Sequence, residues 1–392
     1  MRGFGSSVRE WHPGPVSTDT PAPGTSGVPL RTAVAALPPY VPGARTEPGS
    51  RTFKLSSNEN PYPPLPSVLD AIREAAGDTH RYPDMYATEL TETVAASLTD
   101  HATSHGIPLT VTPDQVVVGT GSVAVLAHVL QTVCEPADEV VVPWRSFEAY
   151  PIAVAVSGAT FVPVPLASSG SAGRLDLPAL AAAVSDRTRV VAVCTPNNPT
   201  GPAVHRDELD AFLAAVPSDV LVLLDEAYVE FVRDPEVPDG LAVYAAHPNV
   251  VVLRTFSKAY GLAGLRVGYA VARPDLAAGV RSVSTPFGVS DLAQRAAIAS
   301  LHAQDELLER VEALVVERAR MLGELRDQGW ELPDAQGNFV WFGLGEETLR
   351  RGAEAREAGV LVRPFAGEGI RVTVGERDAN DAFLRVAASW RR

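Results

Sequence analysis

The chain contains almost no lysine. Of its 33 basic residues, only Lys54 and Lys258 are lysine, and the rest are arginine. Lysine can do what arginine cannot, because its amine loses a proton at accessible pH and can then attack a carbonyl to form a Schiff base. Lys258 is therefore a candidate for covalent chemistry. Scarcity alone assigns it no role, since Lys54 is equally rare, so the neighbouring residues must decide.

Cysteine is also scarce. Cys134 and Cys194 each end an apolar run and show no metal-ligand spacing, which predicts buried, reduced thiols and no metal site. No apolar run is long enough for a transmembrane helix, and the N-terminus lacks the apolar core of a signal peptide. We therefore expect a cytoplasmic protein with no membrane partner.

Positive charge is outweighed by negative charge. The formal net charge is −14 and the sequence pI is near 5.1, which argues against nucleic acid or an anionic membrane as the main partner. Local arginine sites for small anions remain open. Apolar residues make up 46% and charged residues 20% of the chain, which is typical of a globular protein rather than a disordered one.

The order of apolar runs predicts an α/β protein with two domains. From about residue 115, β-branched runs alternate with helix-like stretches, which indicates a mostly parallel sheet with crossover helices. The later runs "NFVWFGL", "GVLVRPF" and "GIRVTVG" lie among helix-like segments and predict a small α+β domain. Residues 289–330 have helical periodicity with a break near Asp305.

We divide the chain accordingly. The predicted parts are a leader over 1–34, an arm over 35–54 that packs on the small domain or on a partner subunit, a large domain over 55–285 and a small domain over 286–392. The leader is rich in Pro, Gly, Ser and Thr, which indicates disorder or an over-long gene start.

The first chemically informative segment is "VVVGTGSVAVL", a strand, a glycine turn and a helix start. Ligands bind outside the carboxyl ends of the strands of an open parallel sheet, and free N–H groups at a helix start attract phosphate. The segment also matches the dinucleotide fingerprint G-x-G-x-x-A, with Asp138 near the expected distance. The long stretch of chain before this strand and the remaining motifs favour a different cofactor.

Two further segments end apolar strands. "CTPNNPTG", residues 194–201, places asparagine and proline in a loop, and taken alone it indicates only a turn. "VLVLLDEAYVEF" places Asp225 at the end of a buried strand, with Tyr228 shortly after it. A carboxylate at that depth is unfavourable without a cationic or strongly donating partner, although a helix cap or a salt bridge would also supply one.

The fourth segment is "RTFSKAYGLAGLRVGY" around Lys258. Thr255, Ser257 and Arg266 offer hydroxyl and guanidinium groups to a phosphate beside the amine, whereas the plain alternative is a surface lysine in a glycine-rich loop. Phosphate donors, a carboxylate, a tyrosine, an asparagine and a lysine at adjacent strand ends together match the needs of pyridoxal 5'-phosphate. The carboxylate would keep the pyridine nitrogen protonated, and the lysine would form the aldimine and move the proton.

With these motifs the sequence resembles the fold-type I pyridoxal-phosphate aminotransferases, and within them the histidinol-phosphate aminotransferase family. It looks most like the actinobacterial aromatic amino acid (phenylalanine) aminotransferases of that family. The likeness covers about residues 35–390 and includes "KLSSNENPYPPLPSV", "RYPD", "PWRSFEAYP", "TPNNPTG", "DEAYVEF" and "GNFVW". It implies a large domain with a mostly parallel seven-stranded sheet, a small α+β domain and a homodimer with shared active sites.

The resemblance also implies roles for individual residues at the cofactor. Lys258 would be the Schiff-base lysine, Asp225 the partner of the pyridine nitrogen, and Asn198 with Tyr228 the donors to the ring oxygen. Phe147 would stack on the ring, at a position where tyrosine is common, and Tyr82 would reach the phosphate from the partner subunit. The implied phosphate ligands are Gly121, Ser122, Thr255, Ser257 and Arg266.

The implied substrate residues lie mostly near the two ends of the chain. Arg371, in "GIRVTVG", would clamp the substrate α-carboxylate, because a planar guanidinium donates two parallel hydrogen bonds to a carboxylate. Arg363, Tyr40, Asn58 and Asn338 would surround the same end of the pocket. Surface positions for the two arginines, and a simple turn at Asn58, are the alternatives.

The implied activity is a ping-pong transamination between an aromatic amino acid, of the phenylalanine or tyrosine type, and 2-oxoglutarate. Histidinol-phosphate transamination is the first alternative, because the same arginine pair suits either a carboxylate or a phosphate. A decarboxylase acting on a phosphorylated amino acid is the second. A non-catalytic cofactor-binding or regulatory module is the third, but the leader has no helix-turn-helix pattern and every cofactor position is filled.

Overall fold

The computed structural model describes residues 28–37, 52–167 and 173–391. The chain divides into two units, residues 1–41 and 42–392. Helix α1 (Thr32–Ala35) is the element described in the first unit. Most of the predicted leader and arm therefore lies outside the described residues, and the domain boundaries stay a prediction. No helix in the described part of the chain is long and apolar enough to cross a membrane.

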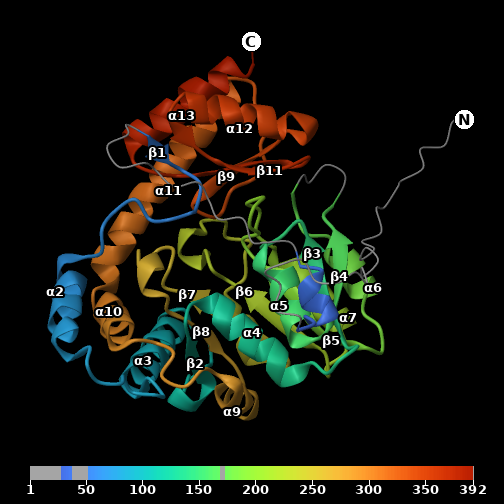
Figure 1. Cartoon of the computed structure of the whole chain (residues 1–392), viewed down its shortest axis with the longest axis vertical. Helices are drawn as coiled ribbons and strands as arrows, with labels where there is room; N and C mark the ends of the chain where they lie inside the picture. Colours follow the sequence, from blue (N-terminus) through green and yellow to red (C-terminus); the bar gives the residue numbers. More distant parts are fainter. Residues whose placement is uncertain (1–27, 38–51, 168–172, 392) are drawn as a thin grey trace, which may run out of the picture. The chain divides into compact units, whose positions relative to one another are not determined.

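A seven-stranded sheet forms the centre of the second unit (Figure 1). Six of its strands run in one direction, and only the strand from Gly268 to Val271 is antiparallel to both of its neighbours. The predicted α/β class with a mostly parallel seven-stranded sheet is therefore confirmed. In spatial order the strands are β2 (Val116–Gly119), β8 (Gly268–Val271), β7 (Val250–Thr255), β6 (Leu221–Asp225), β5 (Thr188–Cys194), β3 (Glu139–Trp144) and β4 (Thr160–Pro165).

Both faces of this sheet are buried, because successive side chains of a strand point to opposite faces. In β5, for example, Val190 and Ala192 belong to one apolar cluster, while Val191 and Val193 belong to the other. The first cluster also contains residues of α4 (Ser122–Val133), α5 (Ala149–Ser157) and α9 (Pro274–Val283). The second contains residues of α3 (Thr88–Ser104), α6 (Leu177–Ala182), α7 (Arg206–Ala215) and α8 (Gly240–Ala246).

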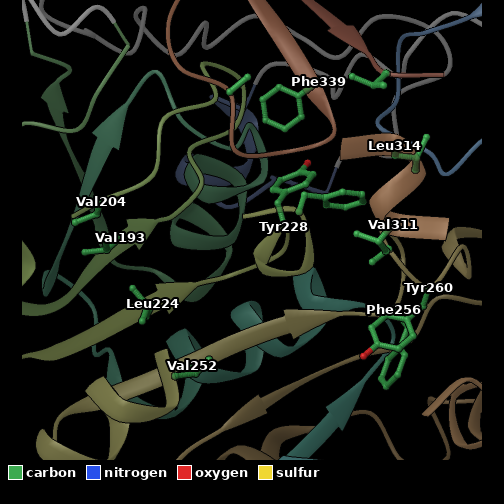
Figure 2. Close-up of a cluster of buried hydrophobic side chains, with 14 of the residues drawn as sticks. Val193, Val204, Leu224, Tyr228, Val252, Phe256, Tyr260, Val311, Leu314 and Phe339 are labelled. Carbon is green, nitrogen blue, oxygen red and sulfur yellow. The ribbon is translucent and has the colours of Figure 1, made fainter. Parts of the chain in front are cut away.

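The second cluster continues into the C-terminal part of the chain. Figure 2 shows Leu224 and Val252 of the central strands in one apolar region with Val311 of α11 (Gln304–Asp327) and Phe339. Helix α11 follows α10 (Asp291–His302) after a single residue, close to the break expected near Asp305. The Tyr228 ring packs edge-on against Phe339, with the ring centroids 5.0 Å apart.

A three-stranded antiparallel sheet and two helices make up the rest of the C-terminal part (Figure 1). The sheet has the order β11 (Arg363–Phe365), β12 (Gly369–Thr373) and β9 (Phe339–Gly343), and its helices are α12 (Thr348–Glu357) and α13 (Arg377–Ser389). The short β1 (Phe53–Lys54) pairs with β10 (Val360–Leu361). This pairing joins the start of the second unit to its end. Helix α2 (Pro66–Ala75) lies against α10.

A buried ion pair lies beside the carboxyl end of the central strands. Arg254 of β7 donates from Nε and Nη2 to Glu226 Oε2 at 2.9 and 2.8 Å, and both side chains are buried. Burial raises the pKa of Glu226, and the guanidinium of Arg254 opposes that rise. A Cβ at Gly240 would collide with the Glu226 carboxylate, so the start of α8 requires glycine there. The pair thus anchors the segment that follows β6.

We expect Arg254→Met to lower the free energy of unfolding by about 3–5 kcal/mol, because it leaves a buried carboxylate without its cation. Urea denaturation of the purified protein measures the change. The matched control is Arg295→Met, which breaks the exposed Arg295–Asp291 pair. This variant should lower the free energy of unfolding by about 1 kcal/mol or less. Equal losses in the two variants would contradict the structural role of the buried pair.

Candidate active site

The predicted site residues converge at the carboxyl edge of the large sheet. Asp225 ends β6 and lies in register with Cys194, the last residue of β5. Asn198 follows β5, and Lys258 follows β7. Because parallel strands place their carboxyl ends at one edge, segments that are far apart in the chain meet here.

The Asp225 carboxylate is buried and only half satisfied. Its Oδ2 accepts a 2.7 Å hydrogen bond from the Tyr150 hydroxyl, whereas Oδ1 has no hydrogen-bond partner among the described residues. Desolvation raises the pKa of Asp225 to about 6, although the Tyr150 hydrogen bond lowers it. A buried oxygen without a partner is unfavourable unless a donor or cation is supplied. The protonated ring nitrogen of pyridoxal 5'-phosphate is such a donor, so this carboxylate fits that cofactor.

The Lys258 amine lies near the same edge. Its Nζ donates to the carbonyl oxygen of Ser57 at 3.4 Å and stands 5.7 Å from the centre of the Tyr228 ring. Desolvation, with the positive charges of Arg371 and Arg266, lowers the pKa of Lys258 to about 7. A large fraction of this amine is therefore neutral at neutral pH, which is the form that attacks a carbonyl or accepts a proton.

The predicted phosphate ligands lie around the start of α4. Gly121 precedes this helix with φ +82°, and a Cβ there would collide with the Arg266 guanidinium. Arg266 Nη1 donates to Ser257 Oγ at 3.1 Å, and the Ser257 N–H donates to Thr255 Oγ1 at 3.1 Å. Ser122 is the first residue of the helix, whose free N–H groups favour an anion. The structure therefore brings together the five predicted phosphate ligands.

The predicted ring-oxygen donors are part of a buried polar network. Tyr228 accepts a 3.0 Å hydrogen bond from Asn58 Nδ2, and burial raises the pKa of Tyr228 to about 12, so its hydroxyl keeps a proton to donate. Asn198 Oδ1 accepts from Arg371 Nη1 at 2.6 Å. Arg371 Nη2 also donates to the carbonyl oxygen of Ser56 at 2.8 Å. This network positions Arg371 beside the residues that surround Lys258.

Asn58 links three parts of the chain. Its N–H donates to Thr373 Oγ1 at 2.9 Å, and its carbonyl oxygen accepts from Asn338 Nδ2 at 3.3 Å. Its backbone has φ 52°, a value that asparagine tolerates better than most residues. Asn58 thus connects Tyr228, Thr373 and Asn338.

The remaining predicted residues lie less centrally or are not described. Phe147 packs edge-on against Tyr150, with centroids 5.8 Å apart, and so lies next to the residue that holds Asp225. Arg363 Nη2 is 2.7 Å from Glu148 Oε2. Tyr82 is 83% exposed, and its ring packs at a tilt against Phe287 with the centroids 4.7 Å apart. Tyr40 lies outside the described residues.

Sequence reasoning missed Tyr150 and Glu148. Both lie in the "PWRSFEAYP" segment, of which only Phe147 was singled out. The Tyr150 partner is 75 residues away and the Glu148 partner 215 residues away. A tyrosine shortly after Phe147 was the only available signal.

The chain is similar to known aminotransferases over most of its length. Residues 50–386 match the family "Aminotransferase class I and II". The aromatic amino acid aminotransferase of Streptomyces avermitilis is 56% identical over 93% of this chain and 98% of that protein. The enzyme of the same name from Mycobacterium tuberculosis H37Ra is 48% identical over 92% and 98%. The chain therefore belongs to the class I and II aminotransferases.

Solved structures agree with this family. Histidinol-phosphate aminotransferase from Sinorhizobium meliloti, solved in complex with pyridoxal 5'-phosphate, has a TM-score of 0.76 and 30% identity, covering 86% of this chain and 91% of that one. An aspartate aminotransferase of Thermus thermophilus has a TM-score of 0.75 at 23% identity, covering 91% and 99%, and shares the fold. The predictions of an aminotransferase with a type I fold and of pyridoxal 5'-phosphate as cofactor are confirmed.

We expect Tyr150→Phe to weaken cofactor binding at neutral pH by roughly tenfold, because a hydrogen bond to a charged group contributes about 1.5–3 kcal/mol. Loss of that bond raises the pKa of Asp225 further. As the pH is lowered, the variant should therefore lose cofactor binding at a higher pH than the wild type does. Titration of the apoenzyme with pyridoxal 5'-phosphate between pH 5.5 and 8, roughly the range in which such a carboxyl titrates, measures both effects.

The control for this variant is Tyr244→Phe. The Tyr244 hydroxyl is also buried and accepts one hydrogen bond, from Gln115 Nε2 at 2.7 Å, but it does not contact Asp225. Tyr244→Phe should leave the pH profile of cofactor binding unchanged. If both variants shift the profile equally, Tyr150 does not act through Asp225.

Lys258→Met should change how apoenzyme stability depends on pH. Between about pH 7, where Lys258 titrates in the folded chain, and its ordinary value of 10.5, the unfolded chain binds a proton that the folded chain does not. The free energy of unfolding therefore rises with pH over this interval, and Lys258→Met should remove part of that rise. Denaturation at pH 7 and pH 9.5, roughly the ends of the accessible part of the interval, tests this. Lys54→Met, which removes an amine paired with Glu59, should retain the rise.

Proposed function

We propose that this enzyme transfers the amino group of an aromatic amino acid, of the phenylalanine or tyrosine type, to 2-oxoglutarate. The observation that carries the proposal is the near full-length similarity, at about half identity, to enzymes named aromatic amino acid aminotransferases. The arrangement of Lys258, Asp225 and Arg371 supports it, because transamination needs an amine that can be neutral, a buried carboxylate and a cation for the substrate anion.

In this proposal the polar residues hold the cofactor at both ends. Pyridoxal 5'-phosphate supplies a ring that accepts electrons from the substrate α-carbon. Asp225 Oδ1 keeps the ring nitrogen protonated, and Tyr150 orients that carboxylate from its other oxygen. Asn198 and Tyr228 donate to the ring oxygen, and Phe147 packs on the ring. The phosphate ligands are Gly121, Ser122, Thr255, Ser257 and Arg266.

A second group of residues would hold the substrate and remove its α-proton. Arg371 binds the α-carboxylate and is itself oriented by Asn198 and Ser56. Arg363, Tyr40, Asn58 and Asn338 surround the same end. Lys258 Nζ, neutral in a large fraction of molecules near pH 7, removes the proton from the substrate α-carbon. Arg371 and Arg266 favour the neutral form of this base by their positive charges.

We further propose a homodimer in which Tyr82 contributes to the partner's phosphate site. Tyr82, Met85, Tyr86 and Phe287 are all exposed on the single chain, and Tyr82 stacks on Phe287 at 4.7 Å. Exposed aromatic groups of this size are typical of a surface that a partner covers. The two cysteines are free, which agrees with a reducing compartment, and we infer a cytoplasmic location.

Histidinol-phosphate transamination is the second candidate. The structural relative from Sinorhizobium meliloti bears that name, and Arg363 lies directly opposite Arg371 in the small sheet. Two adjacent arginines are a common site for a phosphate group. The choice between the candidates depends on which anion this pair binds.

We expect kcat/KM with 2-oxoglutarate as acceptor to be at least roughly tenfold higher for phenylalanine than for histidinol phosphate, a difference of about 1.4 kcal/mol in transition-state stabilisation. Initial rates with the two donors measure this. The negative control is Lys258→Ala, which should abolish turnover and the visible absorbance of the lysine-linked cofactor. A preference for histidinol phosphate, or release of carbon dioxide without a keto acid, would overturn the proposal.

A further inference from the structure

Two ion pairs connect the loop after β3 with the small sheet. Arg145 binds Glu368, which precedes β12, and Glu148, which precedes α5, binds Arg363 of β11. The two pairs have opposite polarity. In one the loop supplies the arginine and the small sheet the glutamate, and in the other the loop supplies the glutamate and the small sheet the arginine. Both pairs lie near Phe365, because the guanidinium carbons of Arg145 and Arg363 are each 5.5 Å from its ring centroid.

The Glu148–Arg363 pair lies beside Arg371, the residue proposed to bind the substrate anion. Arg363 and Arg371 are directly opposed partners of β11 and β12, and such partners point to the same face of a sheet. Their guanidinium carbons lie 5.5 and 5.9 Å from the Phe365 ring centroid. Arg371 donates to neutral oxygens of Asn198 and Ser56, whereas Arg363 donates to a carboxylate.

The two amino-group donors, phenylalanine and histidinol phosphate, differ in the charge of the anionic group that would face Arg371 and Arg363. An amino acid presents a carboxylate with one negative charge, whereas a phosphate monoester carries close to two at neutral pH. A phosphate would need more positive charge than a carboxylate does. It would also have to approach the Glu148 carboxylate, or displace it from Arg363.

We propose that Glu148 is a specificity residue that disfavours phosphate monoester substrates by neutralising Arg363. The proposal rests on the proposed function, because it concerns the substrate pocket of that reaction. Like charges brought together at a recognition site oppose binding, and such repulsion is a common means of rejecting the wrong ligand. With Arg363 neutralised, Arg371 binds the amino acid carboxylate and the additional charge of a phosphate is unmatched.

A purely structural role is the competing explanation. The pair joins the large-sheet loop to the small sheet, so its loss would affect the closure of the pocket for every substrate. The Arg145–Glu368 pair offers a matched control, because it joins the same two regions and contacts the same Phe365 ring. Glu368→Gln removes a carboxylate of the same kind while leaving Arg363 paired.

The experiment compares kcat/KM for phenylalanine and for histidinol phosphate in the holoenzyme and its variants. Glu148→Gln keeps the shape of the side chain and removes its charge. We expect it to raise the ratio of histidinol-phosphate to phenylalanine kcat/KM by roughly tenfold, mainly through a lower KM for histidinol phosphate. Glu368→Gln should leave this ratio unchanged, and Glu148→Gln combined with Arg363→Gln should abolish the gain.

The outcomes separate this inference from the proposed function. If the wild type favours phenylalanine but Glu148→Gln leaves the ratio unchanged, the inference fails and the proposed function stands. Equal changes in Glu148→Gln and Glu368→Gln would also overturn the inference, because they would indicate an effect on closure. If the wild type favours histidinol phosphate, both fail, since Glu148 then does not exclude a phosphate.

Discussion

The arrangement of the site depends on a carboxylate that the fold buries without fully satisfying. Asp225 ends a central strand, where it is paired with the buried Cys194 and Leu253 of the two flanking strands. Tyr150 occupies one carboxylate oxygen and leaves the other for a cation. In the proposed function, the cofactor's protonated ring nitrogen supplies the missing partner, so its binding would recover the free energy lost by this burial.

Lys258 and the arginines near it differ in chemistry, because only the lysine can become neutral near pH 7. Burial lowers the pKa of Lys258, and the permanent charges of Arg371 and Arg266 lower it further. The same guanidinium groups hold the neighbouring side chains Asn198 and Ser257. The groups proposed to bind the two anionic ends of the reactants therefore also prepare the base between them.

Much of the large domain follows from local patterns in the sequence. The runs "RVVAVC" and "DVLVLLDE" predict strands buried on both faces, and the position of Asp225 and Lys258 after such strands predicts their convergence. The antiparallel direction of β8 has no comparable signal, because a short apolar strand is compatible with either direction. Strand order likewise depends on packing between helices that are distant in sequence.

The substrate end was harder to derive from residues alone. Asn58 contacts Thr373 across 315 positions, and Glu148 contacts Arg363 across 215. Neither contact leaves a periodic trace in the sequence, since each joins segments that only the tertiary fold brings together. Family resemblance supplied Asn58 and Arg363 as candidates, whereas Glu148, which resemblance did not supply, emerged only from the structure.

The scarcity of lysine has a chemical consequence for cofactor loading. Pyridoxal 5'-phosphate is an aldehyde, and an aldehyde reacts with any accessible neutral amine. This chain offers it two lysine amines, of which Lys54 is paired with Glu59 and Lys258 lies in the pocket with a pKa near 7. Arginine carries the remaining positive charge without offering a competing nucleophile. A chain with so few lysines therefore presents few side-chain amines that could compete with Lys258 for the aldehyde.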